Sequence, residues 1–418
     1  MGTYRVKILS GLGILFLIFP WSAPSGTVET ELAAEIDRIR KEKEPASLEE
    51  LWPPDLPEKE NGAGFYRRAF CLLENLETSH AEIWKFIPFA GTIPWEKLSP
   101  EEKKKVAYLL LEEPSFQEFY SLIEKASQRK CLFFSQSEAG KIVELVLPYL
   151  NRMRKITRLV CARITLLNEN RQPDQGMHWC LVGLRLSSSL SSPVLLVTAL
   201  TGMAMDQVIL KRLAETIKHQ PREKDICRQV QKIIQEKGQE NLLAQAFVSE
   251  RVLCGLQNWP VGCISEEEGK LKSEQVNDRF KQEQLFYLRF MSSCVKMARK
   301  SYWMIRQELQ REIRSIPEQN TFLVKNLAAV VEKGFQAEAR YKSSLVATGL
   351  GLACYLYKLT YSSYPSSLQE LIPEFLPVVA VDPFTGKNYT YHTRGKTALL
   401  YKPGESNQEK DQVVWELP

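Results

Sequence analysis

Asp174 and His178 are the residues of this chain whose types and spacing best suit catalysis. They lie four positions apart, and residues with this spacing share one face of a helix. A carboxylate beside an imidazole can orient the ring as a general base, which would suit a hydrolase. The alternative is structural: a helix start with Asp174 near the positive end of the dipole and His178 packed or capped. We therefore assign no catalytic residue and keep Asp174 and His178 as candidates.

The rest of the sequence offers no second catalytic pattern. It has four histidines, and it lacks the HExxH, Gly-x-Ser-x-Gly, Walker and Gly-x-Gly-x-x-Gly motifs. Adjacent glutamates stand at the ends of expected helices, where capping and solvation explain them. The net charge of +5, from 55 basic and 50 acidic residues, is too balanced for nucleic-acid binding. We expect no cofactor, no metal ion and no nucleic-acid partner, and we favour a non-enzyme.

Most of the chain has the periodicity of amphipathic helices. Ser99 and Ser115 each stand three residues before a glutamate, which is the pattern of a capping box. We expect segments 222–237 and 239–257 to pair antiparallel across Gly238. The other expected helices are 30–43, 65–76, 140–168 with a bend or break at Pro148, 174–219 broken near Pro193, a long helix from Ser265 to about 314, and 318–333 and 335–359 separated by Gly334.

Strand signals appear only near the carboxyl end of the chain. Segments 389–392 and 398–402 flank a turn that contains Gly395, which predicts a hairpin. The expected fold is mainly α, a multi-helix array with a small C-terminal α/β element made of a short helix and a β-hairpin. We divide the chain into residues 1–26 as signal peptide or membrane anchor, 27–334 as a helical domain, and 335–418 as a long helix with the α/β tail.

The first residues have the pattern of an export segment. Arg5 and Lys7 precede a mainly apolar run over residues 8–19, which is shorter than a comfortable membrane span. This run suits a cleaved signal peptide, and a span that continues through Ala23, with Trp21 at the interface, would suit a retained anchor. A plain cytosolic protein is the third interpretation. Either of the first two would export the rest of the chain to the periplasm or the outer face of the inner membrane, with the N-terminus of an anchored form in the cytoplasm.

The nine cysteines are scattered and form no CxxC pair, so zinc ribbons and thioredoxin-like chemistry have no support. Most stand among apolar residues, where a free thiol packs as a small hydrophobe. Cys254 and Cys263 bracket a turn-like loop, and a disulfide between them would depend on export to an oxidising compartment. The cysteine pairing stays open.

The tail has the densest cluster of turn and cap signals. Tyr364-Pro365 ends a helix, Ser367 and Glu370 form the pattern of a capping box, and the Asp382–Gly386 segment forms a tight turn. This order resembles the C-terminal region of the type II secretion major pseudopilin. The chain is also similar to uncharacterised exported or membrane-anchored helical proteins of planctomycete-type bacteria, with which it shares segments 61–70 and 246–251.

The resemblance implies a location and a fold, but it implies no enzymatic activity. The N-terminus lacks the pseudopilin leader pattern, and the acidic residues near the end lack calcium-loop spacing. The main hypothesis is a non-catalytic exported protein of the cell envelope that acts as a scaffold or interaction module. Its partners would be the membrane, through an uncleaved N-terminal segment, and other envelope proteins. The alternatives are an exported hydrolase with its site in a helical cleft and an accessory component of a secretion or pilus-like machine.

Overall fold

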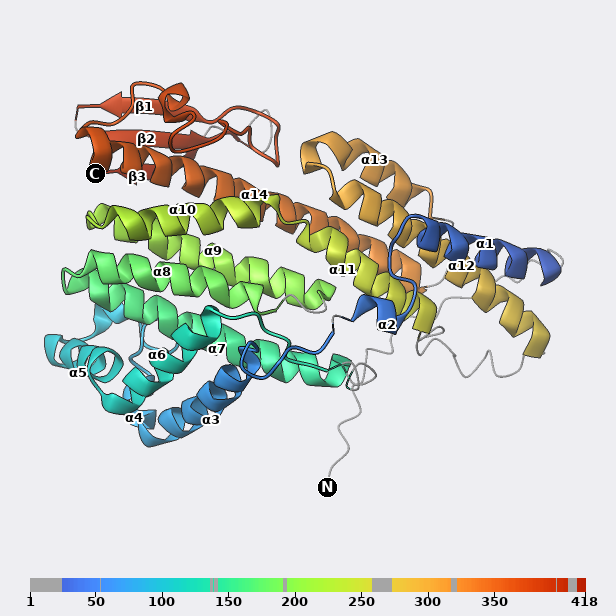
Figure 1. The fold of residues 1–418 in the computed structure, drawn as a ribbon, viewed down its shortest axis with the longest axis horizontal. Helices are drawn as coiled ribbons and strands as arrows, with labels where there is room; N and C mark the ends of the chain where they lie inside the picture. The colour runs from blue at the N-terminus through green and yellow to red at the C-terminus, as the bar shows by residue number, and fades with distance from the viewer. Residues whose placement is uncertain are drawn as a thin grey trace.

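The described part of the chain is an array of helices with a small sheet at its carboxyl end (Figure 1). The computed structural model describes residues 25–52, 54–135, 138, 142–190, 194–257, 273–316, 322–395, 397–404 and 412–418. The expected mainly α fold with a small C-terminal α/β element is therefore confirmed. The helices are α1 Ser25–Lys41, α2 Leu48–Leu51, α3 Ala63–Ser79, α4 Ala81–Trp84, α5 Pro100–Leu111, α6 Pro114–Ser127, α7 Ile142–Glu169, α8 Pro173–Ser188, α9 Leu196–Lys218, α10 Lys224–Gln239, α11 Leu242–Glu250, α12 Ser273–Ala298, α13 Tyr302–Arg314 and α14 Phe322–Tyr361.

The short elements complete the described chain. A π-helical turn, η3 Arg251–Gln257, follows α11 directly, and two 3₁₀ turns lie at η1 Trp95–Lys97 and η5 Leu368–Leu371. The strands β1 Thr390–Arg394, β2 Thr397–Lys402 and β3 Gln412–Leu417 form one antiparallel sheet in the order β1-β2-β3. The predicted hairpin is confirmed as β1 and β2, whereas β3 was not predicted.

The long helices lie in successive layers. Helix α8 packs against both α7 and α9, and α14 packs against α9 and α10. Figure 1 shows α14 running along the array from the α12 end of the molecule to the sheet. At one end α1 packs against α12, and at the other β2 and β3 pack against α14. The buried apolar side chains of these layers join in one core, which runs from Trp52 to Leu417.

Local chemistry explains where two of the helices begin. The Ser99 hydroxyl accepts a hydrogen bond from the Glu102 amide, and the Glu102 carboxylate accepts one from the Ser99 amide, so the predicted capping box is confirmed. The capping box predicted at Ser115 is wrong, because α6 begins earlier, with Glu113 as its cap. Pro114 is the reason: proline is favoured at the first helical position, which makes the residue before it the cap.

Two predicted helix boundaries are wrong. The helix expected to run to residue 314 is divided between Ala298 and Tyr302 into α12 and α13. Gly334 does not end a helix, because α14 continues through it and packs there against the side chains of Leu196 and Leu243. One glycine costs a helix about 1 kcal/mol, a penalty that burial of the long apolar face outweighs.

The predicted antiparallel pair across Gly238 is also wrong. Gly238 lies inside α10, and the helix ends at Gln239, before Glu240, which has extended backbone angles. Helix α11 then continues beyond the end of α10 in Figure 1 and packs on α9 and α12. Pro148 lies within α7 without dividing it.

The tail packs directly on the helical array. The Tyr389 hydroxyl donates to the backbone oxygen of Ser343 in α14 at 3.0 Å. A Cβ atom added at Gly351 would lie 2.5 Å from the Trp415 ring, so a glycine is needed where β3 crosses α14. The Asp382 turn is confirmed: its carboxylate accepts from the Thr385 amide, and Gly386 has a φ of +74°. The tail is thus part of the body of the protein.

Candidate functional site

Asp174 joins two helices. It stands in the first turn of α8, as predicted. Its Oδ1 accepts hydrogen bonds from the backbone amides of Arg222 and Glu223, at 2.7 and 2.9 Å. These amides belong to the loop that leads into α10, so the carboxylate fixes the start of α10 against the start of α8.

His178 has a different partner. Its Nε2 lies 2.8 Å from Oε1 of Glu124, which comes from α6. Both side chains are partly exposed, and the pair joins α6 to α8. The two catalytic candidates therefore share α8, as their spacing predicted, but the structure gives each a separate partner and does not pair them.

The thiols that the fold buries are poorly suited to nucleophilic chemistry. Burial raises the pKa of several cysteines to about 12, and a nucleophile must be a thiolate. These are Cys131, Cys161, Cys227, Cys254 and Cys354. Cys254 lies near Glu250, with 3.6 Å between its sulfur and Oε2. The Cys254–Cys263 pairing that the sequence left open involves Cys263, which lies outside the described residues.

A buried ion pair crosses the centre of the array. Nζ of Lys237 in α10 lies 3.1 Å from Oδ2 of Asp206 in α9, and the two side chains are 2% and 1% exposed. Asp206 also accepts hydrogen bonds from the hydroxyls of Ser187 and Tyr341, each at 2.7 Å. Lys237 donates to the Ser187 and Ser188 hydroxyls. The cluster links α8, α9, α10 and α14.

This central cluster resembles a serine–lysine pair in composition only. In such a pair the lysine is the base that takes the serine proton, whereas Lys237 lies 3.1 Å from the Asp206 carboxylate as its ion-pair partner. The adjoining cavity has a volume of about 20 Å³, which is room for one water molecule and not for a substrate. We interpret the cluster as a structural junction.

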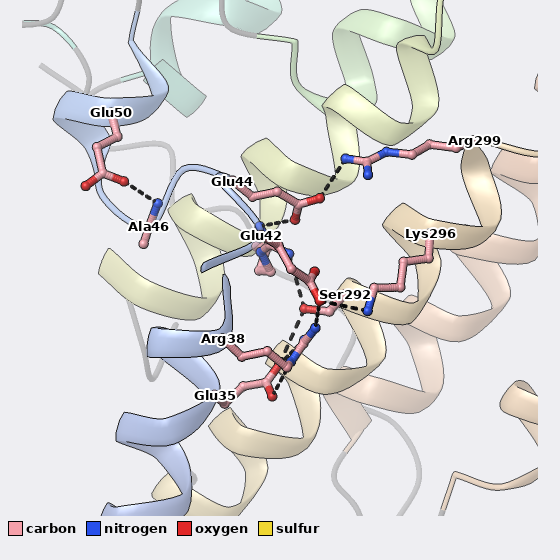
Figure 2. Close-up of polar contacts among 10 residues, drawn as sticks. Glu35, Arg38, Glu42, Glu44, Ala46, Glu50, Ser292, Lys296 and Arg299 are labelled. Atoms are coloured by element: carbon pink, nitrogen blue, oxygen red, sulfur yellow. Dashed lines mark hydrogen bonds and ion pairs between the residues drawn. The ribbon is translucent and has the colours of Figure 1, made fainter. Parts of the chain in front are cut away.

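Among the described residues, a set of charged contacts fastens α1 and the segment after it to α12 and η3 (Figure 2). We call it the N-terminal latch and define it by six residues listed below. Glu44 lies 2.6 Å from Arg299 and 2.8 Å from Arg251, measured between carboxylate oxygen and guanidinium nitrogen. Glu42 lies 2.9 Å from Lys296. The latch residues are Glu35, Glu42, Glu44, Arg251, Lys296 and Arg299.

The centre of the latch is dry. Arg251 is fully buried and Glu44 is 8% exposed. Nη1 of Arg251 donates to the Ser292 hydroxyl, while its Nε and Nη2 make no aligned hydrogen bond. The contact of Nη2 with Glu44 is therefore mainly one of charge. Losing Glu44 would leave the Arg251 charge buried without a carboxylate beside it, whereas losing Arg251 would leave Glu44 paired with Arg299.

Two more pairs extend these contacts along α1. Glu31 lies 2.9 Å from Arg289, and Glu29 pairs with Lys281, whose hydrogen bond and charge lower the pKa of that carboxyl. Glu35, at the buried side of α1, is bound by Arg38 and accepts from Ser292. Acidic groups of α1 thus face basic groups of α12 along the length of the contact.

The described residues include no group of three or more histidine, cysteine, aspartate or glutamate side chains that could hold a metal ion. Within the same residues, no helix is long and apolar enough to cross a membrane. The central cluster and the latch were not predicted from the sequence. A single charge inside an apolar run, as at Asp206, was the signal that could have indicated the central cluster.

Comparisons of the chain with protein-family models, with curated proteins and with solved structures give no match.

Proposed function

We propose that this chain is an exported, non-catalytic helical protein of the cell envelope that works as a scaffold or interaction module. The observation that carries the proposal is the N-terminal latch. Helix α1 is described from Ser25, and the apolar segment of residues 8–19 precedes it in the sequence. Exposed pairs bind α1 and the segment after it to α12, and the buried contact joins Glu44 to Arg251 of η3, so a membrane attachment at the N-terminus would be connected to the helical body through the latch.

The partners of Asp174 and His178 also support a non-catalytic role. Each side chain joins two helices, and neither lines the recess of about 540 Å³ where α5, α7 and α8 meet. The tail supports a structural role over attachment to a secretion machine, because it packs on α14 through Tyr389 and Trp415. The resemblance to exported helical proteins agrees with this proposal.

The first test is location. A chain with a C-terminal tag would be expressed in a Gram-negative host, and the cells would be separated into cytosol, periplasm and membrane fractions. We expect the protein in the periplasm or in the membrane fraction, with the tag accessible to protease after the outer membrane is opened. Recovery in the cytosol, with the tag protected, would contradict the proposal.

The second test addresses interaction. The tagged chain would be captured from solubilised membranes, beside a Glu44→Ala variant with a loosened latch and a matched Glu31→Ala control. We expect the same envelope proteins with the unmodified chain and with the control, and fewer with the latch variant. The absence of any reproducible partner would count against an interaction module.

A further inference from the structure

A polar recess of about 540 Å³ opens where α5, α7 and α8 meet. Its walls come from the last turn of α5, the last turns of α7 and the connection into α8. Two leucines form the apolar part of the lining. The polar lining residues are Glu112, Arg163, Asn170, Gln172 and Gln175.

Arg163 is the unusual member of this lining, because it is a buried cation without a carboxylate partner among the described residues. Its side chain is nine-tenths buried, and no described ion pair involves it. Nη1 donates to the backbone oxygen of Leu110 at 2.7 Å, and Nη2 donates to Oε1 of Gln117 at 3.3 Å. Nε has no partner.

The surroundings of Arg163 hold the guanidinium in place. Its carbon lies 4.3 Å from the ring centre of Tyr120 and 4.8 Å from that of Trp179. The two aromatic faces attract the cation, although burial lowers its pKa. Glu124 is close enough to favour the charged form, but its carboxylate is bound to His178. The guanidinium is therefore positioned, charged and incompletely compensated.

Other buried cations of the molecule are compensated from within. Lys237 lies against Asp206, and Arg251 lies against Glu44. Burying a charge without a partner is unfavourable. An oxyanion in the recess would give Arg163 the negative counter-charge that Asp206 gives Lys237 and Glu44 gives Arg251. Guanidinium groups bind carboxylates and phosphates with two parallel hydrogen bonds.

The negative charge of Glu112 in the recess restricts the class of ligand further. Glu112 is exposed and makes no ion pair with a described residue. A carboxylate at this place disfavours a multiply charged anion such as a phosphate ester and attracts an ammonium group. The side-chain amides of Asn170, Gln172 and Gln175 make no hydrogen bond to a described residue and can both donate and accept.

We propose that this recess binds a small zwitterion of the amino acid or short-peptide class. The ligand carboxylate pairs with Arg163, its ammonium group faces Glu112, and the amide side chains bind a peptide group between them. A free amino acid and a dipeptide share this chemistry, and the binding experiment separates them.

The test is calorimetric titration of the full chain with four probes: Ala-Ala, N-acetyl-Ala-Ala, Ala-Ala amide and alanine. We expect Ala-Ala to bind, and each blocked form to bind about tenfold more weakly or worse, because each loses one charge-assisted contact. If alanine binds as tightly as Ala-Ala, the ligand is a free amino acid; if it binds more weakly, the ligand is a peptide. Either result supports the proposal.

Variants assign the contacts. Arg163→Met should abolish Ala-Ala binding, whereas Arg158→Met, a matched change at an exposed position of α7, should leave it intact. Glu112→Gln should weaken Ala-Ala to the level of its N-acetyl form and leave the N-acetyl form unaffected. This second comparison holds even if Arg163→Met fails to fold.

Three results would overturn the proposal. The first is the absence of measurable binding by both Ala-Ala and alanine at millimolar concentration. The second is equal binding of the free and N-acetyl dipeptides, which would describe a plain anion site. The third is unchanged binding in a folded Arg163→Met variant.

Discussion

Lys237 and Arg163 are both buried cations, and the protein surrounds them in opposite ways. Lys237 has a carboxylate and two hydroxyls around its ammonium group and adjoins a cavity of about 20 Å³. Arg163 has a carbonyl, an amide oxygen and two aromatic rings, and it lines a recess of about 540 Å³. The difference shows that a buried charge is informative only together with its counter-charge: where the chain supplies one, the charge is structural, and where it does not, a ligand can.

Arg251 falls between these two cases. It is as buried as Lys237 and has a carboxylate beside it, but two of its nitrogens make no aligned hydrogen bond. Its counter-charge, Glu44, lies on the segment after α1 and not within the central helices. The latch is therefore a junction between the N-terminal segment and the central helices, and the ion pair of Glu44 with Arg251 is one of the contacts that hold them together.

The largest expected effect is on the central cluster. Asp206→Ala should lower the free energy of unfolding by about 3–5 kcal/mol, because it leaves the Lys237 ammonium buried without its carboxylate. Denaturant titration followed by circular dichroism measures this loss. Asp225→Ala, an exposed aspartate of α10, is the matched control, with an expected change below about 0.5 kcal/mol. A similar loss of unfolding free energy in both variants would contradict the view that Lys237 depends on Asp206 as its counter-charge.

Glu44→Ala should have the next largest effect, a loss of about 2–3 kcal/mol, because it leaves Arg251 buried without a counter-charge. Amide hydrogen exchange should accelerate in α1 more than in α8. Glu31→Ala removes an exposed pair and should cost less than about 1 kcal/mol. Uniform acceleration across the chain would mean that the latch is not a separate junction.

Arg163→Met should cost much less than Asp206→Ala, about 1 kcal/mol in the absence of ligand. The change loses two hydrogen bonds and the contacts with Tyr120 and Trp179, but it also removes a charge without a carboxylate partner. No buried anion is left behind. Thermal unfolding beside the Arg158→Met control measures it, and a loss near 3 kcal/mol would show that Arg163 is structural, as Lys237 is.

The smallest expected effect concerns Glu250, a buried acid that can be compared with the buried cations. Its carboxylate accepts from the Leu196 amide and from Cys254, and desolvation raises its pKa above the usual 4.5. A group whose pKa is raised by folding stabilises the folded state fully at pH values below its unfolded-state pKa. This stabilisation is lost as the pH rises through the folded-state pKa. Glu250→Gln should therefore gain stability relative to the unmodified protein between pH 4 and pH 8. Melting temperatures across that range would show a constant difference if burial were not the cause.

The sequence predicted the elements with strong local signals. Ser99, the β1–β2 hairpin and the Asp382 turn depend on contacts between near neighbours, and all three are confirmed. Gly334 was misinterpreted because a long helix face, buried against α9 and α10, outweighs the low helix propensity of one glycine. Strand β3 was missed because its pairing with β2 depends on residues distant in the chain.

The candidate site was predictable only in part, for a related reason. The spacing of Asp174 and His178 placed them correctly on one helix. Their partners come from the α9–α10 loop and from α6, and helical periodicity carries no information about such neighbours. Arg163 is also a single charge inside an apolar run, but its lack of a carboxylate partner is a property of the packed helices around it.

The continuity of α14 has a consequence for how the protein can be divided. Its 40 residues correspond to a rod of about 60 Å at 1.5 Å per residue. The rod carries contacts with α12 and α13 near one end and with β2 and β3 near the other. A fragment cut at residue 334 would therefore lose part of the rod and the surface on which the sheet rests. We expect limited proteolysis to yield no stable fragment that corresponds to residues 27–334 or to residues 335–418. The two segments would therefore have to be kept together in any engineered variant.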